Sequence, residues 1–440
     1  MVHTSRRAAA LRVGFGILAS ASLLLVGCSS SADSPAGQPG SPAPAVATAT
    51  QAAPPATPAA APVIAAGTER SIGDVPWEQV GEGWMLAVWT PVTPHHPGVE
   101  PTPGEPTYET ATDVLYLVDP AGNRYSIAEF APGDDKPDLV EWSGDGRHAL
   151  FKSTRDGQPT AVSIDLHTGE RTVVPVDGTP AYTHPDGTAL LVSTSFNGDA
   201  AGTLKRIDMA GNNELVYPTE TLGGAGQFSG HYIESPDGTQ LVLGTANLGN
   251  EVVPRSDNSL VVLANDGTII RTLPAPMSDS RCAPVKWWEP GIVLTQCSEL
   301  GGSGEQLWKV PVDGTAPTAL TAYNAGGGDA PGFEGNLGNW NAFKLPSGTF
   351  LPTAGACGTS FVSRLTPDGH TERVDIPGVS DSVGLVGTSG DDLVIVAQVG
   401  CGGGQSMLTY DPVANTSTVL LGPPSVPGGV ESVRLYPGAE

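Results

Sequence analysis

One pattern returns along most of this chain: a short apolar run, a polar turn that carries Asp or Gly, and a second short run. Seven copies are present, and their starts lie 42 to 56 residues apart. The copies begin at residues 115, 162, 204, 260, 307, 361 and 407. A small sheet repeated at such a period cannot bury both of its faces until neighbours stack against it, so the pattern predicts a β-propeller.

A second repeat lies between these copies. "HPDGTALLVST" at 184–194 returns as "SPDGTQLVLGT" at 235–245 and, more loosely, as "SGDGRHALFKS" at 143–153. Asp can cap its own backbone and Gly supplies positive φ, so each piece predicts a turn between the first and second strands of a blade. The second blade can be interpreted whole, with strands expected at about 138–142, 147–153, 160–166 and 170–175.

We therefore expect an all-β fold, a seven-bladed β-propeller of four-stranded antiparallel blades within residues 71–440. The 57 Gly and 41 Pro also disfavour long helices. A pair of β-sandwiches is the alternative, but it needs no regular period. A last strand at 429–437 should close the ring by pairing within the first blade. The blades are expected at 75–130, 137–177, 180–218, 228–275, 283–322, 340–377 and 382–421.

The N-terminal segment has the features of an export signal. Three arginines precede the apolar run "VGFGILASASLLLVG", which is too short to span a membrane comfortably and ends at Cys28. "LVGCSSS" resembles the lipobox of bacterial lipoproteins, and we expect an actinobacterial one. That resemblance implies cleavage after residue 27 and lipid on Cys28, which would hold the chain at the cell membrane, facing out of the cytoplasm. A plain secretory signal is the alternative.

Residues 28–70 are expected to form a disordered tether. They are dense in Ser, Ala, Pro and Thr and contain almost nothing that could build a core. A Pro-rich stretch of this kind should be extended and semi-rigid. It would hold the folded domain away from the lipid surface.

The repeats carry a further resemblance. "EWSGDG" followed by "IDLHTGE" in the second blade is similar to the repeats of TolB-like propellers, relatives of the WD-repeat class, and the similarity extends over most of residues 75–421. It implies an extracytoplasmic protein that binds other macromolecules and implies no reaction. "SPDGT" also approaches the Asp-box of sialidase-type propellers. The aromatic residue expected after that box is missing, so no sialidase activity is inferred.

Charge excludes some partners. Acidic residues outnumber basic ones 46 to 21, for a net charge of −25. A sequence-independent grip on nucleic acid phosphates is therefore excluded, as is a basic patch on anionic lipid. Loss of residues 1–27 would remove three arginines and no acid, which leaves −28.

Besides Cys28 there are four cysteines, which allow three disulfide connectivities. Cys282 and Cys297 flank two expected strands that meet at Glu289 and Pro290, so their sulfurs should face each other across a hairpin. Cys357 and Cys401 each end the second strand of a blade and would bridge neighbouring blades at one rim. A metal site is the rival interpretation, but no CxxC pair and no His at ligand spacing accompanies them. No metal and no cofactor are expected.

Loops between second and third strands should all emerge on one face, where propellers usually hold ligands. They are expected at 91–112, 195–202, 246–258, 298–306 and 401–406, joined on the same side by 324–339. His95 and His96 lie in the first of these loops, without a partner at defined spacing, and we interpret them as solvated. Asp134, Asp135, Asp391 and Asp392 fall in blade turns, and Trp287 and Trp288 should pack in the core.

No GxSxG elbow, HExxH helix or phosphate loop is present. The sequence therefore favours a non-catalytic module that binds or scaffolds an envelope protein or a glycan. The main alternative is an exported propeller enzyme, a hydrolase or lyase on a glycan, lactone or peptide, whose carboxylates converge in the central channel. A purely structural envelope protein is the third possibility. The oligomeric state is left open.

Overall fold

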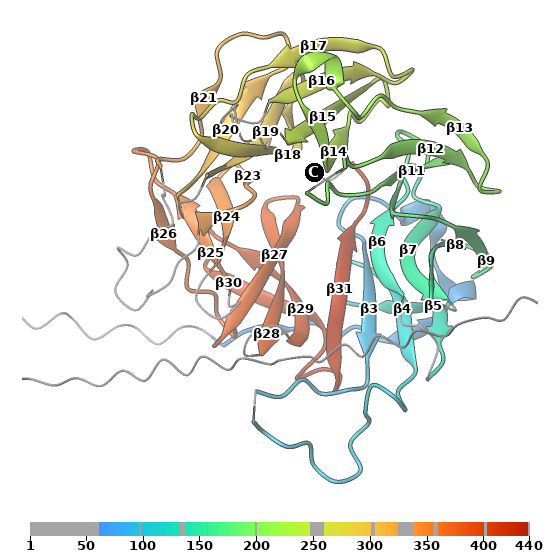
Figure 1. Cartoon of the computed structure of the whole chain (residues 1–440). Helices are drawn as coiled ribbons and strands as arrows, with labels where there is room; N and C mark the ends of the chain where they lie inside the picture. Colours follow the sequence, from blue (N-terminus) through green and yellow to red (C-terminus); the bar gives the residue numbers. More distant parts are fainter. Residues whose placement is uncertain are drawn as a thin grey trace, which may run out of the picture. The chain divides into compact units, whose positions relative to one another are not determined.

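A computed structural model describes residues 61–96, 98–132, 137–155, 157–198, 200–246, 259–300, 304–323, 338–354, 360–399 and 403–438. They form seven antiparallel sheets, arranged in sequence order around a ring (Figure 1). The prediction of an all-β, seven-bladed propeller is confirmed. In the part of the chain that the structure describes, the helical elements are short 3-10 turns, namely η1 (Ile72–Asp74), η2 (Trp77–Gln79) and η3 (Leu222–Gly224), and no helix is long and apolar enough to cross a membrane.

Blades 2 to 5 each contain four consecutive strands. Blade 2 comprises β6 (Asp138–Trp142), β7 (His148–Arg155), β8 (Gln158–Asp165) and β9 (Arg171–Pro175). Blade 3 comprises β10 (Thr179–Tyr182), β11 (Ala189–Ser193), β12 (Leu204–Asp208) and β13 (Asn213–Val216). Blade 4 comprises β14 (Gln227–Glu234), β15 (Gln240–Ala246), β16 (Leu260–Ala264) and β17 (Ile269–Leu273). Blade 5 comprises β18 (Ser280–Glu289), β19 (Ile292–Glu299), β20 (Glu305–Pro311) and β21 (Thr318–Ala319).

Blades 6 and 7 follow the same plan with one interruption. The first strand of blade 6 is split into β22 (Gly338–Asn339) and β23 (Phe343–Leu345), and both pair with β24 (Gly348–Ala354). The blade continues with β25 (Ser360–Leu365) and β26 (Thr371–Arg373). Blade 7 comprises β27 (Ser382–Ser389), β28 (Asp392–Val399), β29 (Gly403–Asp411) and β30 (Thr416–Leu421).

Blade 1 is assembled from both ends of the domain. Its outer strands are β3 (Met85–Thr90), β4 (Asp113–Val118) and β5 (Arg124–Phe130), and its innermost strand is β31 (Gly429–Leu435). β31 pairs antiparallel with β3, with Met85 opposite Leu435. Figure 1 shows the red β31 beside the blue β3. The expected closing strand is confirmed.

The segment before blade 1 also pairs with the ring. β1 (Val63–Ile64) lies parallel to β30 on the outer edge of blade 7, and β2 (Glu69–Ser71) lies parallel to β5 on the outer edge of blade 1. Composition assigned residues up to 70 to the tether, yet 63–64 and 69–70 belong to these edge strands. Edge pairing needs only backbone groups, so an Ala- and Pro-rich segment can supply it.

The core lies between blades. Met85 on β3 packs in a cluster with Met407 of blade 7, whereas the next residue, Leu86, packs in a cluster with Phe151 of blade 2. Successive side chains of a strand point to opposite faces, so each blade is buried on both sides by its neighbours. This is why the sequence needs every copy of its repeat.

Each blade carries an aspartate at the turn between its third and fourth strands. Its carboxylate accepts the backbone N–H two residues further on, at distances from 2.7 to 3.4 Å. The seven residues are Asp119, Asp165, Asp208, Asp266, Asp313, Asp368 and Asp411. The expected turns between first and second strands are also present, with Gly146, Gly187 and Gly238 at φ of 73, 71 and 69°. Some of the acidic residues of this chain therefore serve to form turns.

Removal of β31 by truncation tests the closure of the ring. A chain that ends at Gly428 loses Val430, Val433 and Leu435, all buried in the blade 1 core. Each is worth about 1.5–3 kcal/mol of burial, a sum comparable with the whole stability of a typical domain. We expect no cooperative thermal unfolding by circular dichroism. A chain that ends at Tyr436 is the control and should unfold like the full-length protein; equal unfolding of both chains would contradict this closure.

Acid should destabilise the turns. Hydrogen bonds at the turns lower the pKa of Asp208, Asp266, Asp313 and Asp368 below the usual 3.8. A carboxyl with a lower pKa in the folded state stabilises the fold above its unfolded pKa, and this contribution disappears as pH falls through the folded value. We expect the melting temperature to decrease when the pH is lowered below about 4. Asp266→Asn should weaken this dependence, and an unchanged pH profile in several such variants would contradict the argument.

Candidate functional site

The loops between second and third strands and the links between blades share one face, which we call the loop face. Residues 91–112 join β3 to β4 and residues 194–203 join β11 to β12, as expected. One loop is shorter than predicted, because Gly403–Ser406 belong to β29. Residues 247–258, 324–337 and 400–402 lie outside the described residues.

A cavity of about 270 Å³ opens on the loop face. Three segments form it: the loop of blade 1, the link from blade 6 to blade 7, and the adjoining ends of β28 and β29. The lining residues are Pro94, His95, His96, Val99, Gly378, Val379, Ser380, Asp381, Ala397, Gln398, Val399 and Gln405. Polar groups from separate parts of the sequence therefore meet around one small space.

Both histidines of this cavity have carboxylate partners. His95 Nε2 lies 2.8 Å from Glu105 Oε2, and His96 Nε2 lies 3.5 Å from Asp381 Oδ2. The hydrogen bond from His95 lowers the pKa of the Glu105 carboxyl. The expectation that these histidines are merely solvated is wrong for His95, whose side chain is 25% exposed. Glu105 lies ten residues along the same loop and Asp381 comes from the link to blade 7, so sequence spacing gave no signal.

The side chain of Gln398 contacts two serine hydroxyls beside the cavity. Ser382 Oγ lies 3.1 Å and Ser360 Oγ 3.3 Å from its Oε1. The hydroxyl of Ser382 also accepts the Ser360 backbone N–H at 2.7 Å, and Ser382 is 1% exposed. Among the described residues, the Gln398 amide nitrogen has no hydrogen-bond partner. Hydroxyl groups thus lie beside the carboxamide oxygen of a residue that lines the cavity.

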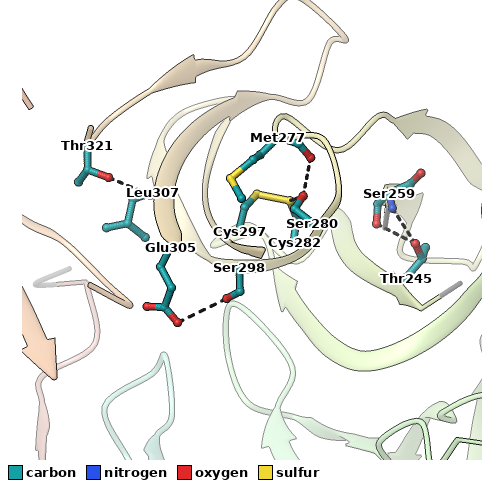
Figure 2. Close-up of a disulfide and its surroundings, with 10 residues drawn as sticks. All are labelled: Thr245, Ser259, Met277, Ser280, Cys282, Cys297, Ser298, Glu305, Leu307 and Thr321. Atoms are coloured by element: carbon teal, nitrogen blue, oxygen red, sulfur yellow. Dashed lines mark hydrogen bonds between the residues drawn. A yellow bond between two sulfur atoms is a disulfide. The ribbon is translucent and has the colours of Figure 1, made fainter. Parts of the chain in front are cut away.

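The predicted disulfide of blade 5 is present. Cys282 and Cys297 face each other as register partners on β18 and β19 and are joined by an S–S bond (Figure 2). Both side chains are buried. Cys28, Cys357 and Cys401 lie outside the described residues, so the lipid site and the second disulfide stay predictions.

Two carboxylates and a histidine meet where the innermost strands of blades 2 to 4 end. Glu141 Oε2 accepts the Tyr182 backbone N–H at 2.7 Å, and Glu141 Oε1 lies 3.4 Å from His184 Nε2. Glu234 Oε2 accepts the His184 backbone N–H at 2.7 Å. No sequence pattern indicated this cluster, because its members come from three blades. Both carboxylates bind main-chain donors of a neighbouring blade, so the arrangement joins blades.

Glu234 is the unusual member. It is 8% exposed, and its Oε1 is buried without a hydrogen-bond partner among the described residues. Burial is the main cause that raises the pKa of this carboxyl above its usual 4.5. No group of three or more potential metal ligands occurs within the described ranges.

The two tryptophans predicted in the core also join blades. The Trp287 indole N–H donates to the Glu234 carbonyl at 2.9 Å, towards blade 4. Trp288 faces the opposite neighbour, where Lys344 Nζ of blade 6 lies 4.4 Å from its ring centroid. Asp391 lies in the turn between β27 and β28 and Asp392 begins β28, near their expected turn, whereas Asp134 and Asp135 are outside the described residues.

The comparisons with known proteins bear on the fold alone. No protein-family model and no curated protein matches the chain. Among solved structures, a prolyl endopeptidase matches with a TM-score of 0.49 and 14% identity, covering 79% of this chain and 50% of that one. The chain therefore spans about half the length of that endopeptidase.

Two further solved structures are similar to this chain. The propeller domain of the Trilobed protease from Pyrococcus furiosus matches with a TM-score of 0.46 and 11% identity, covering 78% of this chain and 95% of that one. TolB from Acinetobacter baumannii matches with a TM-score of 0.39 and 14% identity, covering 80% and 66%.

Removal of the disulfide should destabilise blade 5. The bond closes an interval of 15 residues, for which loop entropy predicts about 3 kcal/mol. Cys282→Ser combined with Cys297→Ser should lower the free energy of unfolding by about that amount in urea titrations. In dithiothreitol, the variant and the reduced wild-type protein should have the same free energy of unfolding. A difference that persists would show that the serines act through packing.

The contribution of Glu234 to stability should change with pH in the opposite direction to that of the turn aspartates. A folded pKa raised above the unfolded value stabilises the fold below the unfolded value, and this contribution is lost as pH rises through the folded pKa. Glu234→Gln keeps an acceptor for His184 and removes the charge, so above about pH 4.5 it should match or exceed the wild type in stability. Glu234→Ala should lose about 1–3 kcal/mol. Urea titrations from pH 4 to 8 measure both, and a Gln variant as unstable as the Ala variant would contradict this assignment.

Proposed function

We propose that this chain is a lipid-anchored extracytoplasmic propeller that acts as a non-catalytic binding or scaffolding module for an envelope protein or glycan. The lipobox-like "LVGCSSS" and the basic, apolar N-terminal segment support the anchor on Cys28. Several acyl chains on one residue would hold the protein stably. The Pro- and Ala-rich segment that follows would carry the propeller away from the membrane, with a reach of about 3.1 Å per residue where it is polyproline-like.

The observation that carries the binding function is the cavity on the loop face. Ligand sites in proteins are concave and combine apolar lining with a few placed polar groups. Here His95, His96, Asp381 and Gln398 surround a space of about 270 Å³ that also contacts Val99 and other aliphatic side chains. Loops at this rim can vary while the ring below holds them in place.

A second candidate function is hydrolysis or elimination at the cluster of Glu141, His184 and Glu234. Convergence of carboxylates from different blades is what a propeller enzyme needs, and the raised pKa of Glu234 is typical of catalytic acids. The geometry favours binding instead, because these carboxylates hold backbone amides and the free oxygen of Glu234 is buried. Turnover of a glycan, ester or lactone that Glu234→Gln abolishes would establish the enzyme.

The anchor has a direct test. Full-length protein expressed with labelled palmitate should carry lipid and enter the detergent phase on Triton X-114 partition. Cys28→Ala should lose both the label and the membrane fraction while the propeller retains its melting temperature. Label that persists in this variant would contradict lipidation at Cys28.

Binding at the loop face can be tested in membranes. Full-length protein is crosslinked in cells and captured, and we expect one stoichiometric protein or wall glycan. Asp381→Lys reverses a charge at the cavity, and Asp391→Lys makes the same change in a turn on the opposite face. The partner should be lost only with Asp381→Lys. Loss with both variants, or with neither, would contradict a loop-face site.

A further inference from the structure

The size of the cavity limits its occupant. At about 270 Å³ it falls just below the roughly 300–1,000 Å³ of pockets for drug-sized ligands. One small ring with polar substituents fills such a space, whereas a folded partner or a long chain could only present one unit to it. The occupant is therefore small, or it is the terminal group of something larger.

The charges around the cavity exclude most ions. No Lys or Arg is among the lining residues. Each imidazole already faces a carboxylate, His95 with Glu105 and His96 with Asp381. An anion would enter a site with no cation left to receive it, in a protein with a net charge of −25. A cation would have to compete with the histidines for the same carboxylates.

The remaining groups suit hydroxyls. A hydroxyl both donates and accepts, so it can bind carboxamides and a serine hydroxyl in any combination. Gln398 and Gln405 supply carboxamides, and Ser380 supplies a hydroxyl. Aliphatic side chains such as Val99 and Val379 lie on the same wall and can cover the C–H faces of a ring.

Gln398 is the best-positioned donor in this set. The Ser382 hydroxyl lies 3.1 Å from its oxygen and can donate to it, which gives the carboxamide a preferred orientation before any ligand arrives. A side chain fixed by its neighbours loses less entropy on binding than a free one. Gln398 is therefore suited to decide which ligand is accepted.

From these observations we propose that the cavity binds one uncharged sugar ring, with Gln398 as the specificity-determining donor and Ser382 as the residue that positions it. The inference rests on the proposed binding function and names its ligand class. It concerns a binding site and involves no bond cleavage.

The experiment uses detergent-solubilised full-length protein and a panel of methyl glycosides. Neutral hexosides and N-acetylhexosaminides are compared with glucuronide, galacturonide and glucosaminide by saturation-transfer NMR and calorimetry. We expect binding of at least one neutral glycoside and at least tenfold weaker binding of its charged counterparts, since one lost hydrogen bond or one unpaired charge is worth about a factor of ten.

Matched variants locate the site. Gln398→Glu should weaken the neutral glycoside about tenfold, whereas Gln158→Glu, on the loop face but outside the cavity lining, should leave the affinity unchanged. Ser382→Ala frees the carboxamide of Gln398 and should weaken the same ligand, with folding checked by thermal unfolding. Retained affinity in Gln398→Glu would overturn the assignment of Gln398 even if sugars bind.

The outcomes separate this inference from the proposed function. Tighter binding of a uronide than of any neutral glycoside would overturn the charge argument. Failure of the whole panel at millimolar concentrations would overturn the sugar ligand, while capture of a protein partner that depends on Asp381 would still support the loop face as a binding surface. Hydrolysis of a bound glycoside would support the sugar site and overturn the non-catalytic assignment.

Discussion

Burial of both faces of every blade is the constraint on which this structure depends. A four-stranded sheet with apolar side chains on both faces is stable only between two others. The ring meets this condition at blade 1, where it closes, by taking the innermost strand of that blade from the C-terminal end of the domain. The residues after that strand strengthen the contact with blade 2, where the ring of Tyr436 lies edge-on to Trp142 at 5.2 Å. The guanidinium of Arg434 donates to the carbonyls of Val140 and Leu139 at 2.6 and 2.9 Å.

Polar contacts between innermost strands continue from blade to blade. Arg434 joins blade 1 to blade 2, Glu141 joins blade 2 to blade 3, and Glu234 joins blade 4 to blade 3. Trp287 then joins blade 5 to blade 4, and Lys344 pairs with Glu289 between blades 6 and 5. Apolar packing between sheets allows sliding, whereas a hydrogen bond to a particular backbone group does not. These contacts therefore help to set the angular positions of blades 1 to 6 relative to one another, and with them the positions of the loops that these blades carry.

What the sequence could reveal follows from the range of each interaction. Turns and cross-strand pairs are local, so the blade limits, the aspartate turns and the pairing of Cys282 with Cys297 could be predicted. The cavity could not, because Asp381 reaches His96 from the other end of the sequence and the two are adjacent only after the ring closes. The short edge strands were missed for another reason. β1 and β2 use backbone groups, and their sequence carries no alternating apolar pattern to reveal them.

The segment that contains these edge strands also approaches the cavity lining. A Cβ on Gly378 would lie 2.6 Å from Pro62, so the segment that enters the domain packs directly on a residue that lines the cavity. The same segment then crosses to blade 1, where a Cβ on Gly67 would lie 1.8 Å from the Gly122 carbonyl oxygen. Only glycine fits at such an approach. The segment thus covers the outer edges of blades 7 and 1, the two blades whose loops and strand ends form most of the cavity wall. A side chain introduced at Gly378 would disturb the edge pairing and the cavity together, so the segment that carries β1 and β2 is part of the site's architecture.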